Sequence, residues 1–174
     1  MMRKERMNDT RAGEKTGILF HAAMAARCFL ENIWPAWQEQ TSREFNVAVP
    51  RIMSCGTCGR SSAFLAKVLS ECAVRSQVEH GWFRITGQAA EGARVSRHAW
   101  VTAERWIIDI TADQFGAPPV LAIAAGDPRY EIGTDTADMV FKTRREDAIN
   151  ALWGRWQISR WRCDLISFLR ECPH

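Results

Sequence analysis

Apolar residues recur at helical spacing over residues 18–46, and one proline interrupts the pattern. The residues at this spacing are Phe20, Met24, Cys28, Ile33 and Trp37. Because a proline inside a helix removes a hydrogen bond and clashes with the preceding turn, Pro35 predicts a boundary between two helices. A second apolar stripe, over residues 61–72, predicts a helix that faces the core. Its members are Phe64, Leu65, Val68, Leu69 and Cys72.

The apolar period changes to two after residue 72. Segments rich in Val, Ile, Trp and Thr then predict four strands, over residues 74–79, 81–87, 96–103 and 106–111. The polar residues 87–96 predict a loop, and residues 139–142 predict a last strand. From residue 145 to about residue 170 the pattern is helical, with Gly154 as a break. Helices, then a meandering sheet, then a helix define an α+β fold.

Length and composition predict one folded domain. With 174 residues, of which 47% are hydrophobic, the chain is long enough to bury a substantial core. Residues 1–16 are polar and charged without apolar periodicity, so we expect a disordered or loosely attached arm there. The single domain is then expected over residues 17–174.

Charge and hydropathy limit the partners and the compartment. A net charge of +3 does not indicate nucleic acid binding, and no apolar run approaches the roughly 18 residues of a membrane span. His21 interrupts the apolar residues 17–26, which therefore predict an amphipathic helix rather than an export signal. We expect neither nucleic acid nor membrane partners. Six cysteines in a chain with its own core are expected to stay reduced, which favours the cytoplasm.

A histidine–carboxylate pair is predicted in SRHAWVTAERWIIDIT, residues 96–111. A turn at Glu104–Arg105 pairs residues whose numbers sum to about 209, which brings His98 and Asp109 to facing positions on neighbouring strands. Cross-strand neighbours have Cβ atoms roughly 4.5–5.5 Å apart, so the carboxylate can accept the imidazole N–H. A carboxylate in an apolar strand is costly unless it is paired, so we expect Asp109 to orient His98.

A nucleophile for this pair is predicted in SCGTCG, residues 54–59. Cys58 lies at the start of the helical stripe, where the helix dipole and a nearby imidazolium favour a thiolate. The backbone N–H groups of the same turn can stabilise the oxyanion of a tetrahedral intermediate. Gly56 and Gly59 allow a tight turn beside a substrate.

Further residues are candidates for stabilising the oxyanion and for lining the substrate cleft. The candidates for a side chain at the oxyanion are Gln38, Gln40 and Asn46. The candidates for the substrate cleft are Cys55, Gly56, Trp100 and Asp113. Asp113 is also an alternative partner for His98, and Trp100 is alternatively a core residue.

Other interpretations of Cys55 and Cys58 stay open. The pair forms a C-x-x-C motif, which is typical of redox proteins within a βαβ unit, whereas the strands here follow as a meander. A zinc site needs four ligands, and only the scattered Cys163, Cys172 and His174 could complete one. Either thiol could be an inert packing residue, and oxidation could join Cys55 to Cys58 as a disulfide.

The combined pattern resembles the transglutaminase-like superfamily. GTCGRSSAFLAKVL (56–69) is similar to its Cys helix, HAWV (98–101) to its His strand, and WIIDIT (106–111) to its W-x-x-D-x-T strand. The resemblance covers residues 56 to about 115, although the His-to-Asp spacing is shorter than in most members. It implies a papain-like core, with the Cys helix on an antiparallel sheet and Cys58, His98 and Asp109 as catalytic residues. Members include transglutaminases, arylamine acetyltransferases, bacterial cysteine peptidases and the leader-cleaving peptidases of lasso-peptide biosynthesis.

We therefore expect a cysteine peptidase or amidase that forms an acyl-enzyme thioester. It requires no metal and no organic cofactor, and it acts on a peptide, a protein or a small amide. The alternative is a non-catalytic binding module that uses residues 144–170, where three tryptophans are interleaved with six arginines. A structural interpretation of that segment packs its tryptophans on the sheet with the arginines outward.

Overall fold

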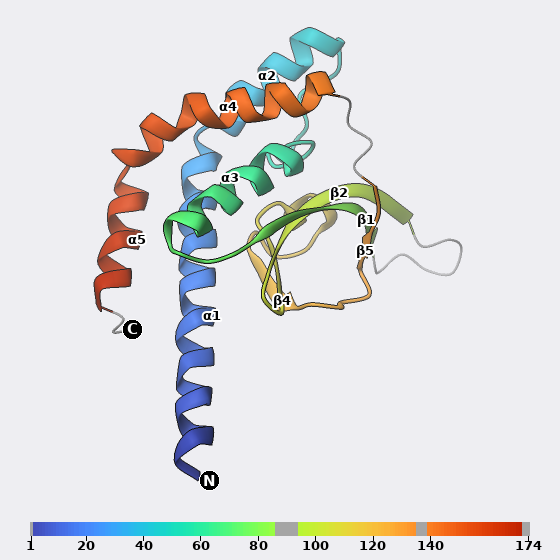
Figure 1. The fold of residues 1–174 in the computed structure, drawn as a ribbon. Coiled ribbons are helices and arrows are strands. Elements are labelled where there is room, and N and C mark those ends of the chain that lie inside the picture. Colours follow the sequence, from blue (N-terminus) through green and yellow to red (C-terminus); the bar gives the residue numbers. More distant parts are fainter. Residues whose placement is uncertain (1, 86–93, 135–138, 172–174) are drawn as a thin grey trace.

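The computed structural model describes residues 2–85, 94–134 and 139–171 (Figure 1). The helices are α1 (Met2–Glu31), α2 (Trp34–Phe45), α3 (Cys58–Glu71), α4 (Met139–Gln157) and α5 (Arg160–Glu171), with a short 3₁₀-helix η1 (Ala112–Phe115). The strands are β1 (Gln77–Ile85), β2 (Arg94–Ala103), β3 (Trp106–Asp109), β4 (Leu121–Ala124) and β5 (Tyr130–Ile132). The predicted α+β class is confirmed.

The strands form one antiparallel sheet in the order β4-β3-β2-β1-β5. β2 and β3 form the predicted hairpin, with Val101 opposite Ile108 and Ala103 opposite Trp106. The turn between them places Glu104 at φ 54°, in the left-handed region. The paired residue numbers sum to 209, so the predicted register of this hairpin is confirmed.

β1 is a single strand where the sequence predicted two, over residues 74–79 and 81–87. Gly81, next to the predicted break at residue 80, lies opposite Ile132 of β5. A Cβ atom on Gly81 would lie 2.0 Å from the carbonyl oxygen of Glu131, so the missing side chain lets β5 approach closely. The prediction of a break was wrong because this glycine serves strand packing.

Two other strand predictions also need correction. Residues 139–142, predicted as a strand, form the first turn of α4, because a short apolar run does not distinguish a strand from a helix end. β4 and β5 are short edge strands that the sequence did not indicate. The predicted loop at residues 87–96 lies mainly outside the described residues, and β2 already begins at Arg94.

The helix boundary at Pro35 is confirmed. α1 ends at Glu31 and α2 begins at Trp34, with Pro35 in the first turn of α2. The N–H groups of a first turn have no acceptor within the helix, so a proline there costs no hydrogen bond. α1 starts at Met2, so its backbone is helical through much of the segment predicted as an arm. The domain boundary at residue 17 stays a prediction.

The buried face of α1 differs from the predicted stripe. Phe20 and Met24 are 44% and 39% exposed. The residues that face the core are mostly smaller: Leu19, Ala22, Ala23, Ala26, Phe29 and Leu30. Alanines at this face let α3 and α5 pack closely against α1, which outweighs the greater hydrophobicity of Phe20 and Met24.

The predicted C-terminal helix consists of two helices. The chain breaks at Ile158 and Ser159, whereas Gly154 continues α4. Ser159 starts α5, because its hydroxyl accepts a hydrogen bond of 3.2 Å from the backbone N–H of Arg162. The break therefore follows the capping residue and not the glycine.

The tryptophans of this region are structural. Trp156 is fully buried and packs edge-on against Phe29 and Phe64, and Trp153 contacts Phe64 in the same way. Trp161 is partly buried with the guanidinium of Arg160 over its ring at 3.8 Å. Trp153 and Trp156 pack on neighbouring helices, which corrects the expectation that they lie on the sheet.

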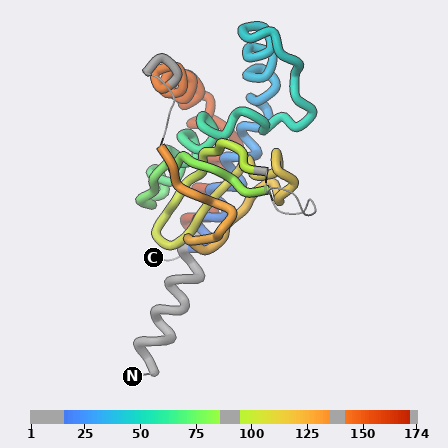
Figure 2. Tube along the Cα trace, turned by 90° about the vertical axis from the view of Figure 1, so that its right-hand side faces the viewer, coloured from blue at the N-terminus to red at the C-terminus, as the bar shows by residue number. Residues whose placement is uncertain are grey.

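The sheet separates two apolar clusters, since successive residues of a strand point to opposite faces. Val101 and Ile108 belong to the large cluster shared with the helices, and Trp100 and Ile107 to a smaller cluster on the other face. Figure 1 shows the helices to one side of the sheet, and Figure 2, turned by 90°, shows strands in front of helices. The candidate site forms where the first turn of α3 meets β2.

Candidate active site

Cys58 is the first residue of α3, as the sequence predicted. Gly56 adopts φ +70°, a conformation that favours glycine, in the turn before it. The first hydrogen bond of the helix runs from the N–H of Ser61 to the carbonyl of Thr57 at 2.9 Å. The N–H groups of residues 58–60 therefore have no partner within the helix and are available at its positive end.

His98 and Asp109 are joined across the hairpin. Nε2 of His98 donates a hydrogen bond of 2.6 Å to Oδ2 of Asp109, and both side chains are completely buried. The register that pairs Val101 with Ile108 places the two residues diagonally on one face, rather than directly opposite as predicted. Diagonal neighbours are within reach of a ring as long as imidazole.

Asp109 has a partner for both carboxylate oxygens. Oδ1 accepts the backbone N–H of Thr111 at 2.8 Å and its hydroxyl at 3.1 Å. Oδ2 accepts the hydroxyl of Tyr130 at 2.9 Å in addition to His98. Burial and the charge of Asp109 raise the pKa of Tyr130, so its hydroxyl stays a donor. These bonds offset the cost of burying the carboxylate and fix its orientation.

Nδ1 of His98 is buried and has no hydrogen-bond partner among the described residues. The imidazole lies edge-on to Phe83 and Phe115 and stacks against Trp100, which excludes water from most of the ring. Cys58 is the neighbouring group that can give a proton to Nδ1. The ring lies close enough to the thiol to lower the pKa of Cys58.

The pKa of Cys58 is shifted in the opposite direction to the pKa values of Cys28, Cys55 and Cys72. Burial raises the pKa of Cys58, but the interaction with His98 and a backbone hydrogen bond from Ala99 outweigh burial and lower it. Burial lowers the pKa of His98, but the charge and hydrogen bond of Asp109 outweigh burial and raise it to about 9. By contrast, burial raises the pKa of Cys28, Cys55 and Cys72. A thiolate–imidazolium pair is therefore favoured at Cys58 and His98.

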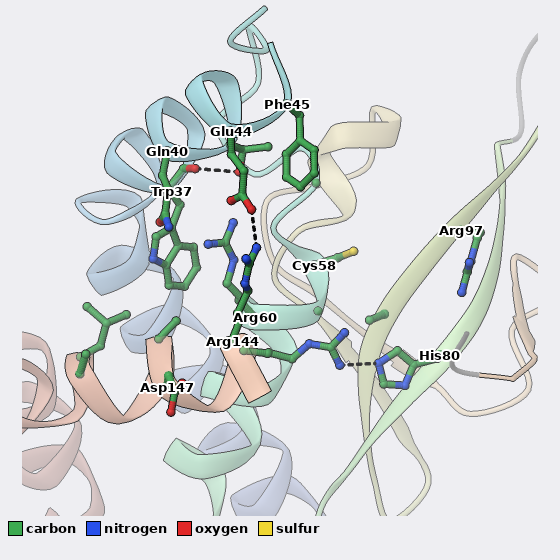
Figure 3. Close-up of a pocket in the computed structure, with 18 of the residues that line it drawn as sticks. Trp37, Gln40, Glu44, Phe45, Cys58, Arg60, His80, Arg97, Arg144 and Asp147 are labelled. Carbon is green, nitrogen blue, oxygen red and sulfur yellow. Dashed lines mark hydrogen bonds and ion pairs between the residues drawn. The ribbon is translucent and has the colours of Figure 1, made fainter. Parts of the chain in front are cut away.

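A cavity of about 1090 Å³ gives access to Cys58 and His98. Its walls come from α2, the first turn of α3, the facing strands β1 and β2, and residues 144–152 of α4. Figure 3 shows Cys58 between side chains of α2 and α4 on one side and His80 and Arg97 of the strands on the other. A cavity of this volume can hold a peptide segment or a small amide.

The loop that carries Cys58 is clamped to the rest of the fold. The hydroxyl of Ser54 donates a hydrogen bond of 2.6 Å to Asp113. Arg27 of α1 binds both carboxylate oxygens of Asp113, at 3.0 and 2.8 Å. Gln38 of α2 donates to the carbonyls of Met53, at 2.9 Å, and Cys55. These contacts hold the loop that precedes Cys58 on two helices and on η1.

The clamp changes the roles expected for two residues. The amide nitrogen of Gln38, an oxyanion candidate, donates to the loop carbonyls, so Gln38 supports the loop backbone. Asp113, the alternative partner for His98, instead binds Arg27 and Ser54. Ser62 joins helix to strand by donating a hydrogen bond of 3.0 Å to the carbonyl of Ala99.

The other candidates are distributed between the cavity, the surface and the core. Gln40 and Gly56 line the cavity. Asn46 ends α2 in the left-handed conformation and is exposed outside the cavity wall, and Cys55 is likewise exposed. Trp100 lies in the small apolar cluster, so the core interpretation of this residue holds.

The sequence analysis missed Tyr130, Arg27 and the role of the arginines of α4. Tyr130 gave no signal, because it lies in a strand that the pattern did not reveal. The sequence did contain a signal for Arg27. This arginine lies within an apolar helical segment, and a buried arginine needs a partner. The arginines of α4 that line the cavity were attributed to a solvent-exposed helix face.

Neither a metal-ligand cluster nor a membrane-spanning helix occurs among the described residues. No group of three or more His, Cys, Asp or Glu side chains among them is arranged to hold a metal ion. No helix in the described ranges has the length and apolar content that crossing a membrane requires. Cys172 and His174, two of the zinc candidates, lie outside those ranges.

Comparison with known proteins gave no match: neither a family model, nor a curated protein, nor a solved structure is similar to this chain.

Proposed function

We propose that this protein is a cysteine hydrolase, a peptidase or amidase, that acts through Cys58, His98 and Asp109. The observation that carries the proposal is the buried His98, which binds Asp109 through Nε2 and leaves Nδ1 for the thiol at the start of α3. Histidine between a carboxylate and a thiol is the arrangement of nucleophilic catalysis. The resemblance to the transglutaminase-like superfamily supports the same three residues and a papain-like core.

In the proposed reaction the thiol proton of Cys58 passes to Nδ1 of His98. The thiolate attacks the amide carbonyl, and a C–S bond forms. When the C–N bond breaks, His98 returns the proton to the leaving amine. Asp109 holds the ring and stabilises the imidazolium through Nε2. Water then releases the acid from the thioester, and an amine in place of water would make the reaction an acyl transfer.

The first turn of α3 is proposed as the oxyanion site. The N–H groups of residues 58–60 have no helical partner, and the helix dipole adds positive potential where the tetrahedral oxygen develops. No side chain is required for this role, which fits the use of Gln38 in supporting the loop. A reducing compartment such as the cytoplasm would keep Cys58 as a free thiol.

Alkylation of Cys58 tests the proposal without a known substrate. Rates with iodoacetamide are measured between pH 5 and 10 by mass spectrometry of the intact chain and its peptides. We expect Cys58 to react as a thiolate at pH 6, and His98→Gln to slow that reaction by about tenfold or more, with recovery at high pH. His21→Gln, at an exposed histidine of α1, is the matched control. Equal rates for the wild type and His98→Gln at pH 6 contradict the proposal.

Trapping the acyl enzyme identifies the chemistry. The protein is incubated with a defined peptide mixture, quenched in acid and analysed for an added mass on Cys58. We expect a thioester adduct in the wild type and none in Cys58→Ser. A disulfide between Cys55 and Cys58 that cycles with dithiols, with no adduct from any peptide, supports the redox interpretation instead.

A further inference from the structure

Arginines gather around the nucleophile. Among the described residues, four arginines line the cavity of Cys58 and His98: Arg60, Arg97, Arg144 and Arg145. Two carboxylates line it as well, Glu44 and Asp147, and Glu44 forms an ion pair with Arg144. Four positive charges against two negative ones leave a formal charge of +2 on the cavity wall.

Arg60 belongs to the first turn of α3, and Arg145 lies against Gly59 of the same turn. Arg60 is two residues beyond Cys58 on α3, and its guanidinium lies 4.3 Å from the centre of the Trp37 ring. It forms no ion pair with any residue that the structure describes. Burial and the charge of Arg145 lower the pKa of Arg60. Two adjacent cations are stabilised when an anion lies between them.

Gly59 makes room for Arg145 beside the nucleophile. A Cβ atom on Gly59 would lie 3.1 Å from Nε, Cζ and Nη2 of Arg145. The guanidinium therefore lies flat against the backbone of the residue that follows Cys58. Its Nη1 lies 3.1 Å from Nε2 of His80 on β1, which fixes the arginine between α4 and the sheet.

We propose that Arg60 and Arg145 bind a carboxylate of the substrate, so that the site selects acyl substrates with an acidic group near the scissile amide. The inference rests on the proposed function of Cys58. A planar guanidinium matches a carboxylate with two parallel hydrogen bonds, and the partly buried cavity strengthens that attraction. The carboxylate that these arginines bind can belong to an aspartate or glutamate side chain or to the α-carboxylate of a chain end.

The ratio of two alkylation rates tests the positive potential at Cys58. Iodoacetate and iodoacetamide differ in one carboxylate, and both transfer their CH₂ group to the thiolate with loss of iodide. Their rate ratio therefore cancels any change in the thiol pKa. We expect the iodoacetate-to-iodoacetamide ratio at Cys58 to exceed that at the exposed Cys55 by about tenfold. A ratio no higher than that at Cys55 overturns the proposal.

Arginine variants show whether Arg60 and Arg145 cause the raised rate ratio at Cys58. Arg60→Gln and Arg145→Gln are each expected to lower the ratio at Cys58 by about threefold or more. Arg155→Gln, on α4 but outside the cavity wall, is the matched control and leaves the ratio unchanged. Circular dichroism checks that each variant is folded, and having two variants keeps the test valid if one fails to fold. A ratio that both folded variants leave unchanged overturns the proposal.

Protection experiments identify the carboxylate. N-acetylglutamic acid α-amide carries only the side-chain carboxylate, N-acetylglutamine only the α-carboxylate, and N-acetylglutamine amide neither. We expect one acid to slow the labelling of Cys58 by iodoacetamide at millimolar concentration, and the neutral amide to have no effect. Equal effects of all three, or protection by phenyl phosphate alone, overturn the carboxylate assignment. A failure of the proposed function gives a different result from a failure of the carboxylate proposal. If the proposed function is wrong, the labelling of Cys58 by iodoacetamide does not depend on His98.

Discussion

His98 and Asp109 lie within the sheet with no exposed side-chain surface, whereas Cys58 lies in the wall of an open cavity. The histidine and its carboxylate are surrounded by aromatic rings, and each carboxylate oxygen has partners from neighbouring residues. The loop before Cys58 is instead held through residues other than Cys58 itself. Ser54 of the loop binds Asp113, which also binds Arg27, and Gln38 binds a loop carbonyl.

This difference shows how one site combines rigidity with access. A proposed base gains from a fixed tautomer and orientation, which burial and complete hydrogen bonding supply. A proposed nucleophile must meet a substrate, so it needs an open side and a firmly held backbone. The following predictions separate these two conditions, because they change either the buried pair or the loop.

Removal of the carboxylate is expected to have the largest effect. Asp109→Ala leaves His98, Thr111 and Tyr130 without their buried partner, and we expect a loss of about 3–5 kcal/mol in the free energy of unfolding. Urea denaturation followed by circular dichroism measures it. Asp127→Ala, at a partly exposed Asp–Arg pair, is the control and should cost about 1 kcal/mol or less. Similar losses for the two variants contradict the distinction between the regions.

Stability is expected to depend on pH through His98. Its folded pKa of about 9 lies above the usual value near 6.5, so its contribution is complete below pH 6.5 and is lost as the pH rises through 9. We expect unfolding free energy to fall by about 2 kcal/mol across this window. The measurement uses Cys58→Ala, which removes the thiol titration. Adding His98→Gln to this variant should flatten the plot of unfolding free energy against pH. An unchanged slope contradicts the assignment of the pH dependence to His98.

The hydroxyl of Tyr130 is expected to contribute less than the carboxylate it binds. Tyr130→Phe removes one hydrogen bond to a buried charge, and we expect a loss of about 1–2 kcal/mol in the free energy of unfolding. A double-mutant cycle with Asp109→Asn measures the coupling between the two groups. Additive effects would show that Tyr130 acts through packing alone.

Cys55 is expected to have the smallest effect. It is exposed, its pKa is raised, and it lies outside the cavity wall, so Cys55→Ser should change stability by less than about 0.5 kcal/mol. The rate at which iodoacetamide labels Cys58 should stay within about twofold of the wild type. Loss of Cys58 reactivity in this variant would show that the two thiols act as one redox pair.

The sequence predicted those features that depend on neighbours along the chain. The stripe of α3, the boundary at Pro35 and the β2–β3 register all follow from local pattern and turn length. The predictions of a break at residue 80 and of a strand at residues 139–142 were wrong, because the structure of both segments depends on contacts with distant segments. Short edge strands gave too weak a pattern to be seen.

The sequence by itself determined which residue types could form the site: a thiol at a helix start, and a histidine and carboxylate within one hairpin. Such local spacing survives folding because turn length and side-chain alternation are set along the chain. Only the tertiary structure decided that His98 keeps Nδ1 free, that Tyr130 supports Asp109, and that Arg145 of α4 lies against Gly59. These contacts join segments far apart in the chain, and their geometry depends on how whole helices and strands pack.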